Sequence, residues 1–559
     1  MADQSQSEIG RARLSRVLAR IWVPLCVLAL AALLLALPML MYGPMPSGHD
    51  TFEHINFTRH FAQQFWHGEL SPRWLLNLNH GLGSATFFVY PPFTCYVYSL
   101  LQPLGEALHF NAFIAMATLA LFASGVSAFL WIRTMAGQGI SLALAVLYML
   151  MPYHLVGDVY RRAAFPECWA LVWMPLLLYF VWRMVKARRG AIAGIAIAYG
   201  LLLLSQPTAA VIFFVIPPLV ALTLAAPGCR IGPPASVCGG MLLGIGLASF
   251  YLLPALFHSR YFPVSKLDLP LDDNLLPLGR SLLQSRLFTR VLALTVDSMF
   301  IFAAVCGAAA FGRARPEQRR QILFWLAMCV ASAFLMSRFS AVLWTRLPWL
   351  LEAVQFPWRF NLVLCIAALP LAAIFASEIS WPTGWWRACA LAVAFFLVAT
   401  WLFAYANVVR DYSDTTPFTH DPISEADGWF DAWKAPGTDS TAALAATAEP
   451  PVRFVSGTGS LRVLQWKPRL LEVQTSSGSG GLVVMNQFYY PEWKARIAGQ
   501  PGGLPVTAAL PQGLLQVQVP PGEHNVRMEI PVGPAERAGR WLSLFSVLVG
   551  LGLIWPARH

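Results

Sequence analysis

Charged side chains are scarce in this chain of 559 residues: Asp, Glu, Lys and Arg make up 12% of it, whereas 57% of the residues are hydrophobic. Soluble globular domains carry about 25% charged residues, so a single water-soluble domain is excluded. The formal net charge is +11. The basic residues mostly punctuate apolar runs instead of gathering on one face, which argues against nucleic-acid binding and is typical of membrane proteins.

The chain also lacks several motifs that specify a chemistry. Its nine cysteines form no Cys-x-x-Cys pair and no Cys/His spacing suited to zinc, so we expect neither disulfides nor a structural metal. There is no Gly-x-x-x-x-Gly-Lys-[Ser/Thr] phosphate loop and no Gly-x-Gly-x-x-Gly between a strand and a helix. These absences argue against direct use of ATP or of a soluble nucleotide sugar.

Long apolar runs are abundant. A membrane helix needs about 20 mostly apolar residues, and the first such run begins at residue 21, after an arginine-rich segment. Since positive flanks stay in the cytoplasm, we expect residues 1–20 to be cytoplasmic. The later runs predict about twelve spans, contained in residues 21–405 and in a last helix within 540–559. Both termini are then cytoplasmic.

The segment 85–104 decides this topology. If it crosses the membrane, the basic clusters at 183–189 and 313–320 fall outside. If it lies in the interface, both clusters fall on the cytoplasmic side, as the positive-inside tendency prefers. We therefore predict a re-entrant or juxtamembrane helix there, a long first outer loop over 43–109, a short outer loop over 157–167, and an outer region over 406–539.

The outer C-terminal region has a different pattern. Short runs with period-two alternation, separated by Gly and Pro, predict a small antiparallel β-sandwich over about 451–532. Aromatic residues gather there at Tyr489, Tyr490 and Trp493. Two interpretations stand: a platform on which a sugar stacks, or packing of the sheet against a turn, which is the commoner role of aromatic side chains.

Candidate chemistry begins in the first outer loop, at residues 48–54. The carboxylate of Asp50 would lie at the membrane–water boundary, which makes it a candidate general base or metal ligand. The alternative is structural, because Asp50 and Glu53 have the spacing of a helix capping box. His49 and His54 could bind a metal together with these acids, but the spacing does not require one, and solvated loop histidines are the alternative.

The short outer loop contains Arg161 and Arg162, although the positive-inside tendency disfavours arginines there. One explanation is a bound phosphate, which pairs with guanidinium groups. The other is internal pairing with Asp158 and Glu167. Glu167 begins the next apolar run, where the helix dipole favours a carboxylate. Further along, Arg359 could bind a lipid phosphate or extend to the membrane interface.

Several short motifs resemble one family. They are His49-Asp50, Gly68-x-x-x-Pro72-Arg73-Trp74, Gly81-x-Gly83, Tyr90-Pro91-Pro92, Arg161-Arg162-Ala163-Ala164-Phe165-Pro166-Glu167 and Gln355-Phe356-Pro357-Trp358-Arg359-Phe360. In this order they resemble bacterial membrane proteins labelled "6-pyruvoyl-tetrahydropterin synthase-related". Despite the label, those proteins are similar to GT-C-type glycosyltransferases, the superfamily of oligosaccharyltransferase catalytic subunits, protein O-mannosyltransferases and aminoarabinose transferases.

The resemblance implies a GT-C-like fold in the bacterial inner membrane. It also implies transfer of a sugar from a polyprenyl-phosphate carrier to an outer-face glycan or lipid acceptor in envelope glycan or glycolipid synthesis. Asp50 matches the family's acid near the start of the first outer loop, and Asp158 or Glu167 matches its acids in the second.

In the implied mechanism the catalytic residues are Asp50 and Glu167, and Asp50 is the general base of an inverting transfer. Arg161, Arg162 and Arg359 stabilise the leaving phosphate. Glu167 or Asp158 either orients these arginines or joins Asp50 around a divalent metal ion.

Two non-enzymatic functions are the alternatives. One is a transporter or flippase of lipid-linked glycans that uses the same basic groove, and the other is a non-catalytic assembly protein of envelope polysaccharide synthesis. The expected partners are membrane lipids, a lipid-linked sugar donor and a glycan or lipid acceptor, and not nucleic acid. A divalent metal ion is the one cofactor considered.

Overall fold

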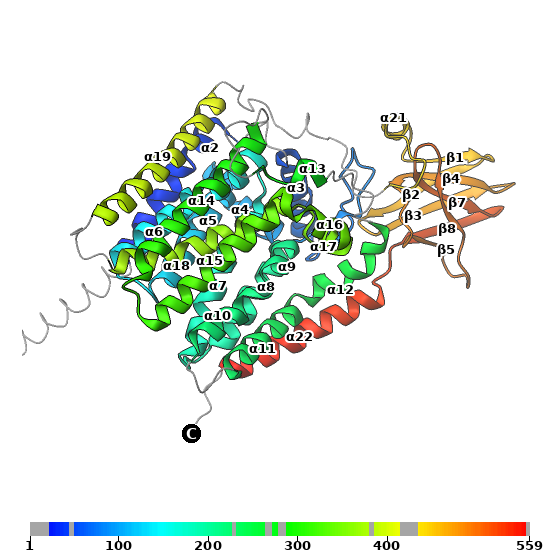
Figure 1. Cartoon of the computed structure of the whole chain (residues 1–559). Helices are drawn as coiled ribbons and strands as arrows, with labels where there is room; N and C mark the ends of the chain where they lie inside the picture. The colour runs from blue at the N-terminus through cyan, green and yellow to red at the C-terminus, as the bar shows by residue number, and fades with distance from the viewer. Residues whose placement is uncertain are drawn as a thin grey trace, which may run out of the picture.

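A bundle of apolar helices with a β-sandwich at one end forms the molecule (Figure 1). This computed structural model describes residues 22–43, 50–225, 231–262, 271–277, 287–378, 385–413 and 434–554. The expected cytoplasmic segment 1–20 and the candidate residue His49 lie outside the described residues.

The helices of the membrane region follow one another with short connections. After the helix Trp22–Leu35, those of the first half are α2 (Leu37–Tyr42), α3 (Thr51–Trp66), η1 (Thr86–Phe88), α4 (Phe93–Leu108), α5 (Ala112–Ile132), α6 (Gln138–Leu150), η2 (Tyr153–Arg162), α7 (Phe165–Val185), α8 (Ala191–Ser205), α9 (Pro207–Phe213) and α10 (Ile216–Leu224).

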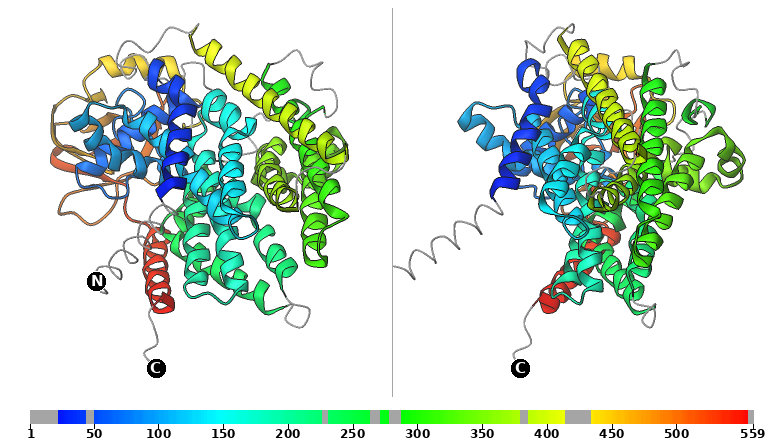
Figure 2. Two further views of the ribbon diagram at one scale, coloured as in Figure 1. Left: turned by 90° about the vertical axis from the view of Figure 1, so that its left-hand side faces the viewer. Right: turned by 60° about the vertical axis from the view of Figure 1, so that its left-hand side comes forward.

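The second half of the membrane region continues in the same way. Its helices are α11 (Gly232–Leu247), α12 (Ser249–His258), η3 (Ser259–Tyr261), α13 (Leu271–Asn274), α14 (Leu287–Phe311), α15 (Pro316–Met336), η6 (Arg338–Ser340), α16 (Ala341–Arg346), α17 (Pro348–Val354), η7 (Pro357–Phe360), α18 (Asn361–Glu378) and α19 (Trp385–Ser413). After the sandwich, α22 (Pro534–Ile554) returns along α11 and α12 (Figure 2).

Seven helical stretches among the described residues are long and apolar enough to cross a membrane. They are Ala112–Ile132, Gln138–Arg162, Phe165–Val185, Pro207–Leu224, Pro316–Met336, Pro357–Glu378 and Leu391–Arg410. The pair Gly232–Leu247 and Ser249–Tyr261, bent by 72°, gives an eighth if it is one span. The chain is thus a helical membrane protein with a C-terminal β region.

The predicted number of about twelve spans is not confirmed, and two breaks explain part of the difference. The run around 191–204 forms α8, which ends after 15 residues because Gln206 is extended before Pro207, as residues before proline tend to be. The first run is divided at Ala36 between Trp22–Leu35 and α2. Each piece is shorter than the about 20 residues of a full span.

The segment 85–104, predicted to lie in the interface, contains η1 and the start of α4. α4 has 16 residues with Pro103 inside it, and it is not one of the candidate spans among the described helices. Its placement in the membrane interface stays a prediction.

The β region is a sandwich of two antiparallel sheets. The helical turns α21 (Ser440–Ala445) and η8 (Ala446–Ala448) lead into β1 (Val452–Ser456), β2 (Ser460–Lys467), β3 (Leu470–Ser477), β4 (Gly481–Phe488), β5 (Lys494–Ile497), β6 (Val506–Ala509), β7 (Leu514–Val519) and β8 (Gly522–Glu529). The strand orders are β1-β4-β7-β6 and β2-β3-β8-β5. Alternate residues of β3 are buried, because successive side chains of a strand point to opposite faces.

The first loop and the sandwich share one hydrophobic core. Trp74 and Phe88 of the loop pack with Tyr490 and Trp493 of the sandwich. At the centre, the side chain of Gln487 accepts a hydrogen bond from the Trp74 indole (2.8 Å) and donates one to the carbonyl of Gly81 (2.6 Å). The sandwich therefore fixes the loop that follows α3.

Gly83 shows how close this contact is. Its φ of +79° favours glycine, and a Cβ there would come within 2.4 Å of Gln487 Oε1. Gly81 has a similar φ of +84° but no atom within 4 Å of a built Cβ. The two glycines share the backbone strain, and only Gly83 adds a steric conflict with the sandwich.

We expect Gly83→Ala to destabilise the protein more than Gly81→Ala, by about 1–3 kcal/mol, because only the first substitution overpacks the contact with Gln487. Thermal unfolding of both variants in detergent would measure the difference. Equal melting temperatures would contradict the close contact between the loop and the sandwich.

Candidate functional site

A buried cluster of charges lies where η2 meets α7. η2 is a π-helix of ten residues, a rare conformation that elsewhere occurs mostly as single turns, frequently at functional sites. It ends at Ala163, which has a left-handed backbone with φ of 55°, and α7 starts two residues later. This turn brings Asp158 and Arg162 of η2 beside Glu167 of α7.

Arg162 is the centre of the cluster. Its Nη1 atom donates to Asp158 Oδ1 at 2.6 Å and to Glu167 Oε2 at 3.1 Å. Its guanidinium carbon lies 4.5 Å from the ring centroid of Trp358, a cation–π arrangement. All three charged side chains are buried. For Arg162, the structure therefore shows the internal pairing that was one of the two interpretations of the sequence.

Glu167 joins a second arginine to the cluster. Arg359 Nε lies 3.5 Å from Glu167 Oε2, and Arg359 Nη1 donates to Gln355 Oε1 at 2.6 Å. The hydroxyl of Tyr153 donates to Glu167 Oε1. The Glu167 carboxylate of α7 thus binds side chains from η2 and η7. The formal charges of the two acids and the two arginines cancel.

Asp50 lies against this cluster. Its backbone N–H donates to the carbonyl oxygen of Arg162 at 2.9 Å, so the first loop and the Arg161-Arg162 segment meet. Asp50 precedes α3, but its side chain makes no capping hydrogen bond. The capping box considered for Asp50 and Glu53 is therefore not formed, and the half-buried Asp50 carboxylate does not serve to cap α3.

His54 is buried one turn into α3, so it is not a solvated loop histidine. Its Nε2 atom lies 2.9 Å from the Tyr90 hydroxyl, and burial lowers the pKa of His54. Burial also raises the pKa of Glu53. The side chain of Arg161 is half-buried beside Arg162.

The buried polar atoms that have no hydrogen-bond partner within the described part of the chain include Thr51 Oγ1 and Asp158 Oδ2. An unsatisfied buried polar group costs about 1–3 kcal/mol, so each needs an explanation. They belong to the start of α3 and to η2, the two elements that Asp50 and Arg162 connect. A polar ligand or water between these elements would satisfy them.

The described residues show no metal centre, and the candidate ligand His49 lies outside them. Across the described ranges, no three His, Cys, Asp or Glu side chains are grouped so that they could hold a metal ion. Asp158 and Glu167 instead pair with arginines. We derive no step through a metal.

The aromatic cluster of the sandwich is largely buried. Tyr490 stacks on Phe88 with a centroid distance of 5.4 Å, and Trp493 makes an edge contact with Trp74 at 5.3 Å. Tyr489 is half-buried. Stacking on a sugar needs an exposed ring face, so this geometry favours the packing interpretation for Tyr490 and Trp493.

Sequence reasoning missed two members of the charge cluster. Trp358 lies within the Gln355–Phe360 motif that was already noted, so its motif was a usable signal. Tyr153 lies in an apolar run, where its hydrogen bond to Glu167 leaves no trace in the pattern.

A family model matches residues 87–409 and carries the description "6-pyruvoyl-tetrahydropterin synthase related domain; membrane protein". The match covers more than half of the chain and includes the Asp158–Arg162–Glu167–Arg359 cluster. The chain belongs to this family. The resemblance drawn from the short motifs is thereby confirmed, while Asp50 and the sandwich lie outside the matched range. No curated protein sequence matches the chain.

Among solved structures, arabinofuranosyltransferase AftD from Mycobacteria is similar at 18% identity and a TM-score of 0.44, over 69% of this chain and 26% of AftD. Oligosaccharyltransferase AglB from Archaeoglobus fulgidus, solved with an inhibitory peptide and a dolichol-phosphate, gives 13% identity and a TM-score of 0.41 over 70% of this chain and 56% of AglB. ArnT from Cupriavidus metallidurans is similar at 15% identity and a TM-score of 0.25, over 65% of this chain and 78% of ArnT.

The chain thus spans about a quarter of the arabinofuranosyltransferase and just over half of the oligosaccharyltransferase. Since no TM-score of the three reaches 0.5, we base no functional conclusion on these neighbours.

We expect Glu167→Gln to destabilise the protein by about 3–5 kcal/mol, because it leaves buried Arg359 without a carboxylate and Arg162 with one instead of two. The exposed Glu352 supplies the matched control, Glu352→Gln, which should change stability by less than about 0.5 kcal/mol. Thermal unfolding in detergent measures both. Similar melting temperatures for the two variants would show that Glu167 does not hold the cluster together.

Proposed function

We propose that the chain is a membrane glycosyltransferase that moves a sugar from a polyprenyl-phosphate carrier to a hydroxyl group of a glycan or lipid acceptor. The observation that carries the proposal is the contact between two elements. The backbone N–H of Asp50, whose half-buried carboxylate does not cap α3, donates to the carbonyl oxygen of Arg162. The side chain of Arg162 belongs to a buried cluster with a second arginine. This contact supports the proposal because it brings the segment of the proposed base to the proposed phosphate-binding arginines.

In the proposed reaction the oxygen of the acceptor hydroxyl attacks the anomeric carbon, while the Asp50 carboxylate accepts the proton of that hydroxyl. The bond between that carbon and the phosphate oxygen breaks, and the phosphate leaves with the electron pair. Attack from the face opposite the leaving group inverts the anomeric configuration, as in inverting glycosidases. The phosphate needs little acid assistance because it is already a weak base.

The arginines stabilise the negative charge of the departing phosphate. Arg162 and Arg359 are held by Glu167, so they need no reorganisation as the charge develops, which is the condition for effective electrostatic catalysis. Arg161, which precedes Arg162 in the chain and is half-buried, would add a further positive charge. Asp158 and Glu167 act as positioning residues for Arg162 in this scheme.

The proposal requires Asp50 and the sandwich to share the outer side of a bacterial inner membrane. Two observations support this. α3 is not one of the candidate spans, and the loop after it packs into the core of the sandwich. The predicted outer loop over 157–167 is largely helical, since η2 ends at Arg162 and α7 begins at Phe165, so only a turn at Ala163 and Ala164 remains. In the proposed topology this turn, the first loop and the sandwich lie on the outer side, toward the acceptor.

Asp50→Asn should reduce sugar transfer from a polyprenyl-phosphate donor by at least 10²-fold, because the amide cannot accept the proton. The assay uses purified protein with a radiolabelled donor lipid. Asp272→Asn, on an exposed aspartate, is the matched control and should retain full activity. Undiminished transfer by Asp50→Asn would remove Asp50 from the role of base.

The same preparation separates the alternatives. Movement of intact donor lipid across a vesicle without sugar transfer would identify a flippase. Absence of both activities, with binding of an envelope-synthesis protein, would identify an assembly role.

A further inference from the structure

A pocket lies at the other end of α3 from Asp50. It has a volume of about 770 Å³, and the loop after α3, the start of α12, the β2–β3 turn and the start of α22 line it. α3 has 16 residues, and at 1.5 Å per residue the two sites are about 24 Å apart along its axis. The pocket is therefore separate from the Asp50 cluster.

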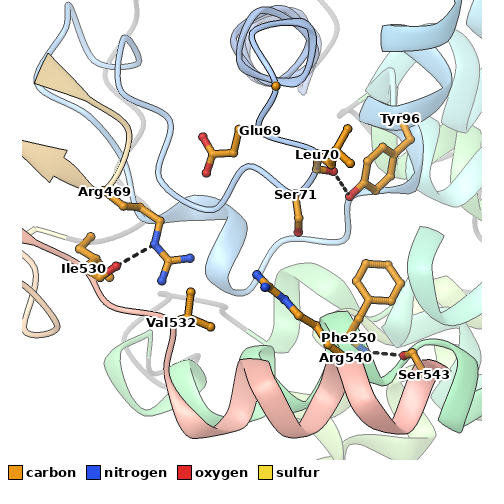
Figure 3. A pocket seen from close by; sticks show the side chains of 11 residues that line it. Glu69, Leu70, Ser71, Tyr96, Phe250, Arg469, Ile530, Val532, Arg540 and Ser543 are labelled. Carbon is orange, nitrogen blue, oxygen red and sulfur yellow. Dashed lines mark hydrogen bonds between the residues drawn. The ribbon is translucent and has the colours of Figure 1, made fainter. Parts of the chain in front are cut away.

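Charged and hydroxyl groups converge on the middle of this pocket. Figure 3 shows Glu69, Ser71, Arg469 and Arg540 directed toward it from three elements, with Phe250 at one side. A polar centre with apolar walls is typical of a site that binds a small ligand or headgroup.

The two arginines of the pocket differ in how firmly they are held. Arg469 Nη2 lies 2.9 Å from Glu536 Oε1 and also donates to the Pro531 carbonyl at 2.8 Å, while its Nε donates to the carbonyl of Ile530 at 3.0 Å. Arg540 makes one longer ion pair, 3.6 Å to Glu536, within the described residues, and its side chain is 57% exposed. Arg540 is therefore the cation best able to contact a ligand.

The floor of the pocket is rigid. The Ser543 hydroxyl accepts from the backbone N–H of Phe250 at 2.8 Å and donates to the carbonyl of Leu247 at 2.9 Å. A Cβ on Gly539 would come within 2.4 Å of the Ser249 carbonyl oxygen. α22 is thus fixed closely against the bend between α11 and α12, and the position of Arg540 is fixed with it.

The residues beside the pocket have the pattern of a membrane interface. Directly after Arg540, the outer face of α22 exposes large apolar side chains: Trp541, Leu544, Phe545 and Leu548. Leu70 at the rim of the pocket is 69% exposed. An arginine followed by tryptophan and an apolar helix face is typical of the membrane interface. A ligand in this pocket would reach the acyl region along α22.

We propose that this pocket binds the phosphodiester headgroup of an anionic membrane phospholipid, with Arg540 contacting the phosphate and with Ser71 and Glu69 hydrogen-bonding the headgroup. Arg540 supplies the charge-assisted contact that phosphate oxygens favour, and the apolar face of α22 accommodates the acyl chains. The proposal does not depend on the transferase activity.

Glu69 adds a dependence on pH. Burial raises the pKa of Glu69 to about 7, against the opposing effects of the Gln64 amide, Arg469 and the backbone N–H of Arg73. The charged groups around it are Arg73, Arg469, Glu536 and Arg540. Below about pH 7 the protonated carboxyl can donate a hydrogen bond to the phosphate. Above it the carboxylate repels the phosphate, so binding weakens as the pH rises.

Arg540→Gln should weaken binding of phosphatidylglycerol about tenfold, since one charge-assisted hydrogen bond is lost. The experiment measures retention of phosphatidylglycerol and of phosphatidylcholine by the full chain, using native mass spectrometry. Arg537→Gln is the matched control: it removes the same charge from an exposed arginine of α22 that does not line the pocket. It should bind like the unmodified chain.

Three outcomes would overturn the proposal: no change in Arg540→Gln, equal weakening in both variants, or equal binding of phosphatidylcholine. Competition by inorganic phosphate at the same concentration as the lipid would show that the site recognises phosphate without its lipid, which also contradicts the proposal. Unchanged thermal unfolding of Arg540→Gln verifies that the variant is folded.

Glu69→Gln tests the role of the carboxyl. In the unmodified chain, phosphatidylglycerol retention should fall by about threefold to tenfold between pH 6 and pH 8, across the pKa of Glu69 of about 7. The phosphodiester keeps one negative charge throughout this range. Glu69→Gln should give a flat profile. The same fall in both proteins would show that another group titrates, and no fall in either would exclude Glu69 from the headgroup site.

Discussion

One buried carboxylate holds the centre of this protein together. Glu167 forms ion pairs with Arg162 at the end of η2 and with Arg359 of η7, and it accepts a hydrogen bond from the hydroxyl of Tyr153. Removing two guanidinium groups from water is expensive, and only well-placed partners offset that cost. Since Arg359 comes from a distant part of the chain, the membrane bundle has to close around Glu167 in one arrangement. The π-helical turn that presents Asp158 and Arg162 belongs to the same arrangement.

A second contact positions the first loop against this centre. Gln487 of the sandwich binds Trp74 and the carbonyl of Gly81, which fixes the chain that follows α3. At the other end of α3, the backbone N–H of Asp50 binds the carbonyl of Arg162. The short helix is thus held at both ends, by the sandwich and by the charge cluster. The β-sandwich therefore helps to place Asp50 at the charge cluster.

The sequence was informative where periodicity or charge placement carries the information. Apolar runs predicted the helical membrane region, and alternation predicted the sandwich. Two arginines in a loop predicted to be outside, against the positive-inside tendency, drew attention to Arg162 before its partners were known. The number of spans was less predictable, because apolar runs such as 191–204 form helices that are shorter than a full span. The capping interpretation of Asp50 failed for a different reason: the spacing fits a capping box, but the side chain makes no capping bond.

Contacts between distant segments left no such signal. Tyr153 and Glu167 are in contact because η2 is a π-helix and the chain turns sharply at Ala163. No residue pattern along η2 predicts that conformation. Likewise, the pairing of Glu167 with Arg359 joins residues nearly two hundred positions apart. The pocket at Glu69 combines the first loop with the last helix, so it exists only once the chain is folded.

The neutrality of the central cluster bears on the proposed chemistry. A sugar phosphodiester carries one negative charge, and the phosphate monoester that leaves carries up to two. Arginines without carboxylate partners would bind the donor tightly before reaction, and catalysis gains only from interactions that strengthen in the transition state. Because Asp158 and Glu167 already balance Arg162 and Arg359, the attraction for the intact donor is moderated. The fixed guanidinium groups then respond mainly to the charge that appears as the carbon–oxygen bond breaks.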